Sequence, residues 1–275
     1  MPELPEVETV RRGLAGHVVG ARIDEVVYGR LRTLRRYDNP QTFVDELLGA
    51  RINRTERIGK YLLLRLHDER ALVVHLRMSG QLLWVPPAVE EPLRKHTHVQ
   101  LRFDSGGELR FVDPRTFGEM FIVDADLSPL AHLGPDALEQ VATPAELAAR
   151  LSGRRAALKT VLLDQTVIAG VGSIYADELC FRAGVRPGRA TDTLRRIDIS
   201  RIHTSMKDVL GEAVAAGGST LGDGQYVGVD GQPGTFAECH GVHARAGEPC
   251  LVCGSLIRTG TVGQRSAYWC PRCQR

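Results

Sequence analysis

The chain contains 275 residues, of which 43% are hydrophobic and 25% are charged. This length and composition are typical of a soluble globular protein with one large domain or two ordinary ones. No apolar run approaches the roughly 20 residues of a membrane-spanning helix. The three glutamates among the first eight residues exclude a secretory signal peptide, so we expect a cytoplasmic protein. The net charge of +2 is too small to indicate a nucleic-acid partner by itself.

The first residues combine a possible nucleophile with a carboxylate. Initiator methionine is normally removed when a small residue follows, and removal of Met1 would leave Pro2 with a free secondary amine. A terminal amine titrates near pH ~8, so part of it is neutral near neutrality and able to attack an electrophilic carbon. Glu3 lies beside it, and Glu6 lies one helical turn further. A structural interpretation stays open, because Pro5 suits a first helical turn and glutamates suit the positive end of a helix dipole.

The next segments predict a helix followed by antiparallel strands. Val7, Val10 and Leu14 fall on one face of a helix that we expect to end at Gly16. Within residues 22–124 the strand-like segments are 61–66, 71–76, 98–103, 108–112 and 119–123. Short strands at this spacing predict an antiparallel β-sandwich.

Helical periodicity dominates the second half of the chain. We expect one helix to start near Thr143 and a glycine-rich, flexible loop over 219–235. Three further helices are expected over residues 159–165, 173–183 and 198–216. The fold class is therefore α+β. We place the domains at residues 1–135, 136–236 and 237–275, because the composition changes near residues 133–135.

Four cysteines near the C-terminus have the spacing of a metal site. Cys250 and Cys253 form one Cys-x2-Cys pair, and Cys270 and Cys273 form a second pair after sixteen residues. This spacing is typical of a zinc ribbon, in which four thiolates hold one structural Zn²⁺. Disulfides and a rubredoxin-like iron site stay open as alternatives, although a cytoplasmic chain disfavours disulfides.

The distribution of cations is more informative than the net charge. From Pro249 onward the chain carries four arginines and no acidic residue. Arg258 and Arg265 lie between the cysteine pairs, where a cationic hairpin would suit a nucleic-acid groove or a phosphate, with solvated surface as the alternative. Lysine occurs only four times. Lys60, at a strand start, is therefore a candidate for chemistry, because a buried lysine can lose its proton whereas arginine cannot. An ordinary strand-end cation is the alternative.

The segment Pro2-Glu3-Leu4-Pro5-Glu6-Val7-Glu8 resembles the N-terminal signature of the formamidopyrimidine-DNA glycosylase family, the bacterial repair enzymes for oxidised purines. The resemblance continues through separated motifs to the end of the chain. It implies a helix–two-turns–helix over Asp164–Glu178, followed by a zinc-ribbon hairpin. A sister branch, endonuclease VIII, acts on oxidised pyrimidines and usually has glycine where this chain has Leu4.

The resemblance implies the catalytic roles. Pro2 is expected to attack C1′ of the damaged nucleoside, with Glu3 as the proton donor and Glu6 in electrostatic support. Lys60 is expected to assist β-elimination. Arg265 is expected to bind the phosphate beside the lesion and to assist δ-elimination.

The resemblance also implies a set of DNA contacts. Met78, Arg115 and Phe117 match the residues that fill the space left by a flipped-out base, although such a Met or Phe is often only a core residue. The amides of residues 170–172 are expected to face a phosphate. The remaining expected DNA contacts are His96, Arg154, Lys159 and Ser173.

Three features depart from the family pattern. Ser173 stands where asparagine is usual, although serine can still cap a helix. His243 stands where tyrosine is common, and the loop 219–233 is longer than expected. The expected partner is damaged double-stranded DNA bound by a monomer, with one Zn²⁺, no nucleotide cofactor and no membrane. An oxidised-pyrimidine glycosylase of the endonuclease VIII branch and a non-catalytic lesion-binding protein stay open as alternatives.

Overall fold

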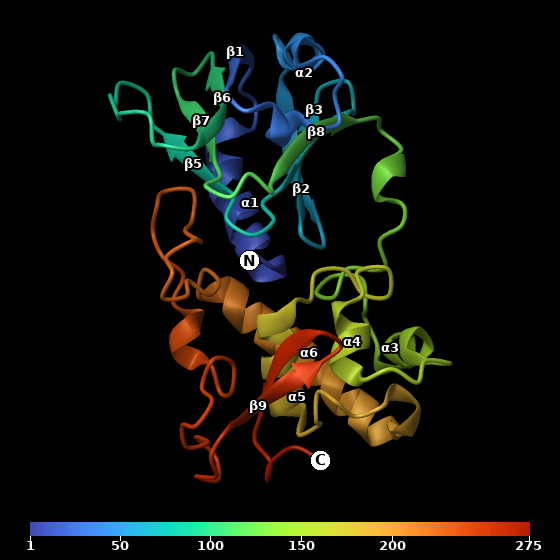
Figure 1. Cartoon of the computed structure of the whole chain (residues 1–275). Coiled ribbons are helices and arrows are strands. Elements are labelled where there is room, and N and C mark those ends of the chain that lie inside the picture. The colour runs from blue at the N-terminus through green and yellow to red at the C-terminus, as the bar shows by residue number, and fades with distance from the viewer. The chain divides into compact units, whose positions relative to one another are not determined.

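The computed structural model describes all 275 residues and divides into two compact units (Figure 1). The sandwich unit contains residues 1–131 and 216–235, and the helical unit contains residues 132–215 and 236–275. None of the helices combines the length and the hydropathy that crossing a membrane requires.

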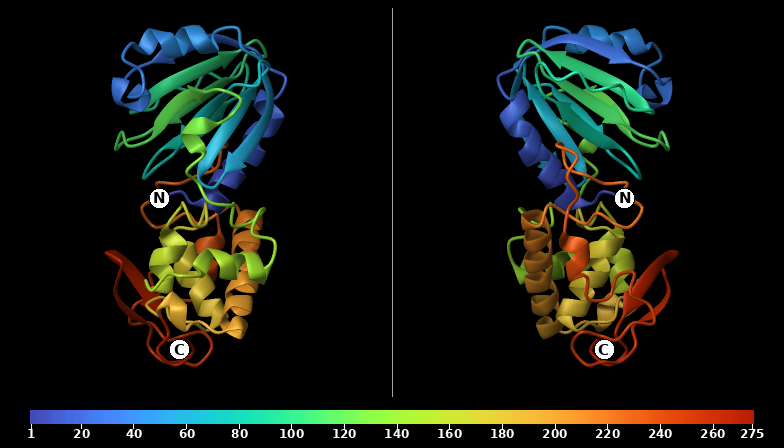
Figure 2. Two further views of the ribbon diagram at one scale, coloured as in Figure 1. Left: turned by 90° about the vertical axis from the view of Figure 1, so that its right-hand side faces the viewer. Right: turned by 90° about the vertical axis from the view of Figure 1, so that its left-hand side faces the viewer.

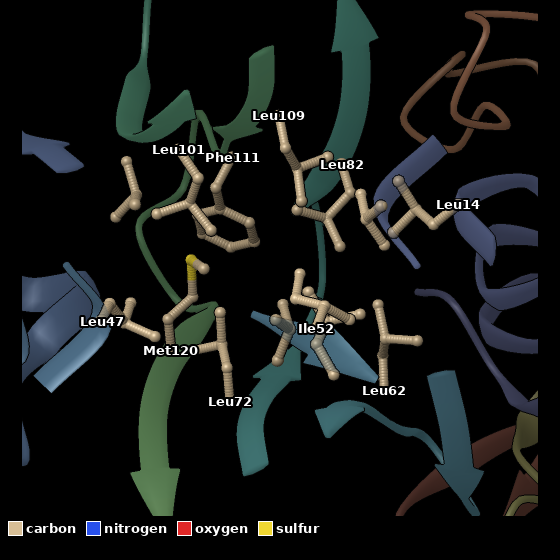
Figure 3. Packing of buried hydrophobic residues seen from close by; sticks show 14 of the residues in the cluster. Leu14, Leu47, Ile52, Leu62, Leu72, Leu82, Leu101, Leu109, Phe111 and Met120 are labelled. Carbon is tan, nitrogen blue, oxygen red and sulfur yellow. The ribbon is translucent and has the colours of Figure 1, made fainter. Parts of the chain in front are cut away.

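The sandwich unit consists of two four-stranded antiparallel sheets. Their strand orders are β1-β6-β7-β5 and β2-β3-β4-β8. Figure 3 shows Phe111 of the first sheet facing Met120 of the second, with leucines of both sheets packed beside them, so the core lies between the sheets. The elements are α1 (Leu4–Val18), β1 (Ile23–Tyr28), η1 (Leu31–Leu34), α2 (Pro40–Leu47), β2 (Ile52–Ile58), β3 (Tyr61–Leu66), β4 (Ala71–His75), β5 (Gln81–Val85), β6 (Thr97–Phe103), β7 (Glu108–Val112), β8 (Glu119–Val123) and η2 (Ser128–Leu130).

The predicted sandwich and its five predicted strands are confirmed. β3, β7 and β8 have the predicted bounds, whereas β4 and β6 differ from the prediction by one residue at one end. The specific prediction omitted β1, β2, β5 and α2. Strand β2 was not predicted because its sequence, Ile-Asn-Arg-Thr-Glu-Arg-Ile, has few apolar residues. Part of the strand is exposed and polar.

Helix α1 buries the predicted face, since Val7, Val10 and Leu14 are all at most 1% exposed. The expected end at Gly16 is wrong, because the helix continues to Val18. A glycine inside a helix costs only about 1 kcal/mol and does not by itself break it. The chain turns at Gly20 instead, whose φ of 85° suits glycine.

Residues 216–235 belong to the sandwich unit, which differs from the three consecutive domains expected from sequence. The physical reason is burial: Tyr226 and Val229 are part of the sandwich core. The carbonyl of Val229 also accepts a hydrogen bond from the Trp84 amide on β5 at 2.8 Å. The segment contains no helix or strand, but its middle is attached to β5.

The helical unit contains the expected helices and a C-terminal hairpin. Its elements are α3 (Pro144–Leu151), α4 (Leu158–Leu163), α5 (Ser173–Ala183), η3 (Thr191–Thr193), α6 (Arg196–Ala215), η4 (Phe236–Cys239), β9 (Arg258–Val262) and β10 (Arg265–Trp269). Thr143 caps α3, as its side chain accepts from the Glu146 amide. Figure 2 shows the hairpin of β9 and β10 beside the helices of its own unit, so the segment 237–275 does not stand alone.

Candidate functional site

The N-terminal carboxylates are buried at the first turn of α1. Glu3 is 2% exposed and Glu6 is 1% exposed. The Glu6 carboxylate accepts from the Glu3 amide at 2.7 Å and from the Ser219 amide at 2.8 Å. Gly218 makes this approach possible, because a Cβ at that position would lie 2.7 Å from Glu6 Oε1. Glu6 therefore fixes the backbone of Glu3, and hence the chain start at Pro2, against residues 218–219.

Lys60 follows Gly59 in the turn between β2 and β3, and it is 7% exposed. Arg57 connects this turn to α1: its Nη1 donates to the Gly59 carbonyl at 3.0 Å, and its Nε lies 3.2 Å from Glu8 Oε2. Within the sandwich unit, the turn that carries Lys60 is thus attached to the helix that starts beside Pro2.

Glu8 is the centre of this attachment. Its Oε1 also pairs with Arg11 and Arg12, each at 2.7 Å. Burial alone would raise the pKa of the Glu8 carboxyl, but hydrogen bonds from Arg11 and Arg12 and the charges of Arg11 and Arg57 lower it to about 2. Sequence reasoning assigned Glu8 only to the helix dipole.

The residues predicted to fill the gap in DNA lie on two connected loops. Met78 is half-buried on the loop before β5, whereas Arg115 and Phe117 are exposed on the loop before β8. Asp113, which is fully buried, connects the loops. Its Oδ1 accepts from Ser79 Oγ at 2.5 Å, and its Oδ2 accepts from the Gly118 amide at 2.7 Å. Asp113 therefore joins the Met78 loop and the Phe117 loop by hydrogen bonds.

His96 lies beside the same loop. Its carbonyl accepts from the Asp113 amide at 3.0 Å, and its φ of 69° is in the left-handed region. The ring is half-buried. The structure thus groups His96 with Met78, Arg115 and Phe117 in the sandwich unit.

Ser173 is the first residue of α5 and does not cap it, which corrects the expectation. The cap position is Gly172, which has no side chain to accept from the first amides. The Ser173 hydroxyl points instead at the Ser266 carbonyl, 3.5 Å away. Of the amides expected to face a phosphate, that of Gly170 already donates to Gln165 Oε1 at 2.9 Å.

Lys159, which is predicted to contact DNA, has a fully buried side chain. Its ammonium donates to Asp177 Oδ1 at 2.7 Å and to the carbonyls of Ser173 and Ser266 at 3.3 and 2.5 Å. An ammonium has three donors, and all three have protein acceptors. Asp177 also pairs with His243 Nδ1 at 2.9 Å. Lys159 therefore holds the hairpin strand β10 to the start of α5.

Arg154 is exposed after α3, beside Gly153 with a φ of 73°. Its Nε donates to the Arg150 carbonyl at 3.2 Å. This bond uses one of the five N–H donors of a guanidinium. The phosphate contact of Arg154 stays a prediction.

The four predicted cysteines converge, and their sulfurs lie within 4.8 Å of one another. The sulfurs of Cys250 and Cys273 are 3.9 Å apart, and those of Cys253 and Cys270 are 3.4 Å apart. Tetrahedral thiolates at a Zn–S distance of ~2.3 Å would be separated by about 3.8 Å. The donor set and its spacing therefore fit one structural zinc ion with no open position.

The hairpin above this cluster presents Arg265. Gln264, with a φ of 63°, forms the turn, and Arg265 is exposed as the first residue of β10. Two anchors fix the strand, namely the cysteine cluster at its end and Lys159 at Ser266. The remaining cysteines are isolated: Cys180 is buried and Cys239 is exposed.

Three family models match consecutive parts of the chain. The Formamidopyrimidine-DNA glycosylase N-terminal domain matches residues 1–120, its H2TH domain matches residues 133–224, and the zinc finger found in FPG and IleRS matches residues 247–275. This chain belongs to the formamidopyrimidine-DNA glycosylase family.

Individual members of the formamidopyrimidine-DNA glycosylase family match over most or all of their length. The Geobacillus kaustophilus enzyme is 43% identical over 100% of both chains. The Symbiobacterium thermophilum enzyme is 45% identical, over 100% of this chain and 89% of that one. The crystal structure of MutM (Fpg) from Thermus thermophilus has a TM-score of 0.87 at 39% identity, with 99% of this chain covered and 98% of that one.

A Lactococcus lactis member of the family is solved in complex with DNA containing N7-benzyl-Fapy-dG. It has a TM-score of 0.89 at 31% identity, with 100% of both chains covered. The expected family, fold class and zinc site are thereby confirmed.

Several organising residues of this family member were missed from sequence. Glu178 accepts from the amides of Gly241, Val242 and His243, at 2.8, 3.0 and 2.7 Å, and so holds the segment before the zinc hairpin. Asp113 shapes the Phe117 loop. A signal existed for Asp113 in the Asp-Pro pair that opens a turn, but none indicates which distant groups a buried acid will bind.

Proposed function

We propose that this protein is a bifunctional DNA glycosylase and AP lyase, which excises oxidised purines from damaged double-stranded DNA in base excision repair. The observation that carries the proposal is the chain start, where Pro2 and Glu3 are fixed at the buried first turn of α1 and Lys60 is attached to that helix through Arg57. A terminal secondary amine beside a carboxylate and a lysine suits iminium chemistry.

The reaction begins at the Pro2 nitrogen once Met1 has been removed, because an amide nitrogen is not nucleophilic. The neutral amine attacks C1′, the bond from C1′ to the base breaks, and the base leaves with a proton. Glu3 supplies a proton to the sugar, and loss of the ring oxygen from C1′ gives an iminium between Pro2 and C1′. Glu6 holds the Glu3 backbone in place.

Strand cleavage follows from the iminium. It acidifies the C2′ proton, and its removal, assisted by Lys60, expels the 3′ phosphate in β-elimination. A second elimination, assisted by Arg265, expels the 5′ phosphate. Water hydrolyses the remaining iminium and releases the Pro2 amine. The steps transfer protons, expel the base and two phosphates and consume water, so the chemistry requires no oxidant and no nucleotide cofactor.

The proposed DNA contacts come from loops of the sandwich unit and from the helical unit. Met78, Arg115 and Phe117 fill the space left by the flipped base, which costs a few kcal/mol to open. His96, Arg154 and Ser173 contact the backbone. Zinc holds the hairpin that presents Arg265. The protein acts as a monomer in the bacterial cytoplasm.

The endonuclease VIII branch is the second candidate. Leu4, where that branch usually has glycine, favours purine lesions. A Lactococcus lactis relative at 31% identity has, however, been solved with oxidised-pyrimidine-containing DNA. Substrate preference is therefore the property to measure.

Incision assays test the function directly. Duplexes with 8-oxoguanine or thymine glycol are incubated with the processed protein, and the products are separated by length and end group. We expect excision and strand cleavage with a higher kcat/KM on 8-oxoguanine. A higher kcat/KM on thymine glycol would assign the protein to the pyrimidine branch. Binding without any cleavage would identify a lesion-binding protein.

A further inference from the structure

Two residues hold the loop that carries Phe117. One is Asp113, which accepts from the Gly118 amide. The other is Arg35, which directly follows η1. Its Nη2 donates to the Phe117 carbonyl at 2.8 Å, and its Nη1 donates to the Gly118 carbonyl at 2.9 Å. A planar guanidinium can span two successive carbonyls in this way, whereas an ammonium is a compact point charge.

A buried carboxylate orients Arg35. Glu119 is 3% exposed. Its Oε2 lies 3.5 Å from Arg35 Nη2 and 3.2 Å from Arg36 Nε, and its Oε1 lies 2.9 Å from Arg77 Nη2. Three guanidinium groups thus share one carboxylate, so a positive charge remains in excess. Because Arg77 precedes Met78, Glu119 also connects Arg35 to the Met78 loop.

Two further cations contact the Phe117 ring, which is 38% exposed. The Arg32 guanidinium lies 5.4 Å from the ring centroid and that of Arg115 lies 5.0 Å from it. Both are within the distance at which a cation is attracted to an aromatic face. The exposed ring is therefore held by its backbone and by neighbouring charges before any DNA is present.

We propose that Arg35 is a positioning residue, which fixes the Arg115–Gly118 loop in the shape that inserts into the base stack. This inference rests on the proposed function. Insertion into DNA has to offset the cost of unstacking. A loop that is already in its inserting shape loses less conformational freedom on binding. Arg35 need not touch the lesion for this role, because it acts through the Phe117 and Gly118 carbonyls.

The test compares Arg35→Gln and Arg35→Lys with Arg36→Gln. The control removes a neighbouring arginine that pairs with the same Glu119 but bonds no loop carbonyl. Two substrates are used, a duplex with 8-oxoguanine and a single strand with an abasic site, which has no partner base to replace. 2-Aminopurine opposite the lesion reports insertion by its fluorescence.

We expect Arg35→Gln to lower kcat/KM on the duplex lesion by roughly 10-fold or more, because small displacements of positioning groups have effects of this size. Cleavage of the single-stranded abasic site should change by less than about 2-fold by the same reasoning. Arg35→Lys should lie between wild type and Arg35→Gln, and Arg36→Gln should resemble wild type. The 2-aminopurine signal should fall with duplex activity.

Equal losses on both substrates, or a loss in Arg36→Gln as large as in Arg35→Gln, would overturn the role of Arg35. If Arg35→Gln does not fold, as judged by circular dichroism, the comparison of Arg35→Lys with wild type on the two substrates tests the role of Arg35. Failure of the wild-type protein to cleave either substrate would instead contradict the proposed function, so the two failures are distinguishable.

Discussion

Glu8 and Arg57 form a buried ion pair in the sandwich unit, with 3.2 Å between Oε2 and Nε and side chains that are 3% and 1% exposed. The pair joins α1 to the turn that carries Lys60. Breaking a buried pair by removing one partner leaves the other charge uncompensated. The stability of the sandwich unit should therefore depend on Glu8 and on pH.

We expect Glu8→Gln to lower the free energy of unfolding of the sandwich unit by about 3 kcal/mol at neutral pH. Denaturation is followed by the fluorescence of Trp84 in a Trp269→Phe background, which leaves one tryptophan in the sandwich unit. Glu25→Gln is the control, because Glu25 is half-exposed and pairs with a half-exposed Arg102. A loss in Glu8→Gln no larger than in the control would contradict the structural role.

The pH dependence has a definite sign. The pKa of Glu8 is lowered from 4.5 to about 2 in the folded state. Its contribution to stability is therefore fully present above pH 4.5 and is lost as the pH falls towards 2. We expect wild type to lose more stability than Glu8→Gln over this window. Parallel curves for the two proteins would show that Glu8 titrates normally.

Lys159 should be a structural residue rather than a DNA contact. We expect Lys159→Met to destabilise the helical unit by about 3 kcal/mol or more, because Asp177 would remain buried with only His243 as its partner. The Trp269 signal of a Trp84→Phe background reports this unit. Lys95→Met, which removes an exposed lysine, is the control. Normal stability combined with a reduced salt dependence of DNA affinity would restore the original assignment.

The departure at Ser173 predicts a gain of function. Ser173→Asn places a longer side chain with two N–H donors at the start of α5. We expect affinity for an abasic-site duplex to increase by about 3-fold, the value of a modest hydrogen bond. Fluorescence anisotropy at a fixed salt concentration measures it. An unchanged or weaker affinity would show that the position does not contact the strand.

Zinc should be needed for the hairpin rather than for the covalent chemistry. We expect one zinc per chain in wild type and none in Cys270→Ser, as measured by mass spectrometry of the metal. DNA affinity should fall by on the order of 100-fold, because the metal supplies the folding energy of such small sites. Cys239→Ser is the control, as Cys239 is exposed and outside the cluster. Wild-type affinity without zinc would contradict this role.

Patterns of local origin were predictable from sequence. The periodicity of Val7, Val10 and Leu14 identified the buried face of α1, and the spacing of Cys250, Cys253, Cys270 and Cys273 identified the metal cluster. Both depend on residues that are near one another in the chain or on a fixed ligand spacing. The resemblance to a known family then supplied roles that composition alone could not.

Long-range partners were not predictable. The sequence around Lys159 does not reveal that Ser266, more than a hundred residues later, provides one of its acceptors. Burial of Tyr226 placed its segment in the sandwich unit, although a glycine-rich composition favoured a free loop. Tertiary contacts decided both cases, and local propensity carries no information about them.

The most direct measurement maps the covalent bond between protein and DNA. The purified protein is incubated with an 8-oxoguanine duplex and borohydride, and the adduct is digested and sequenced by mass spectrometry. We expect the adduct to lie on Pro2 in chains that have lost Met1, and we expect Pro2→Gly and Glu3→Gln each to slow its formation. An adduct on another residue, or undiminished cleavage by the doubly substituted protein, would contradict the proposed mechanism.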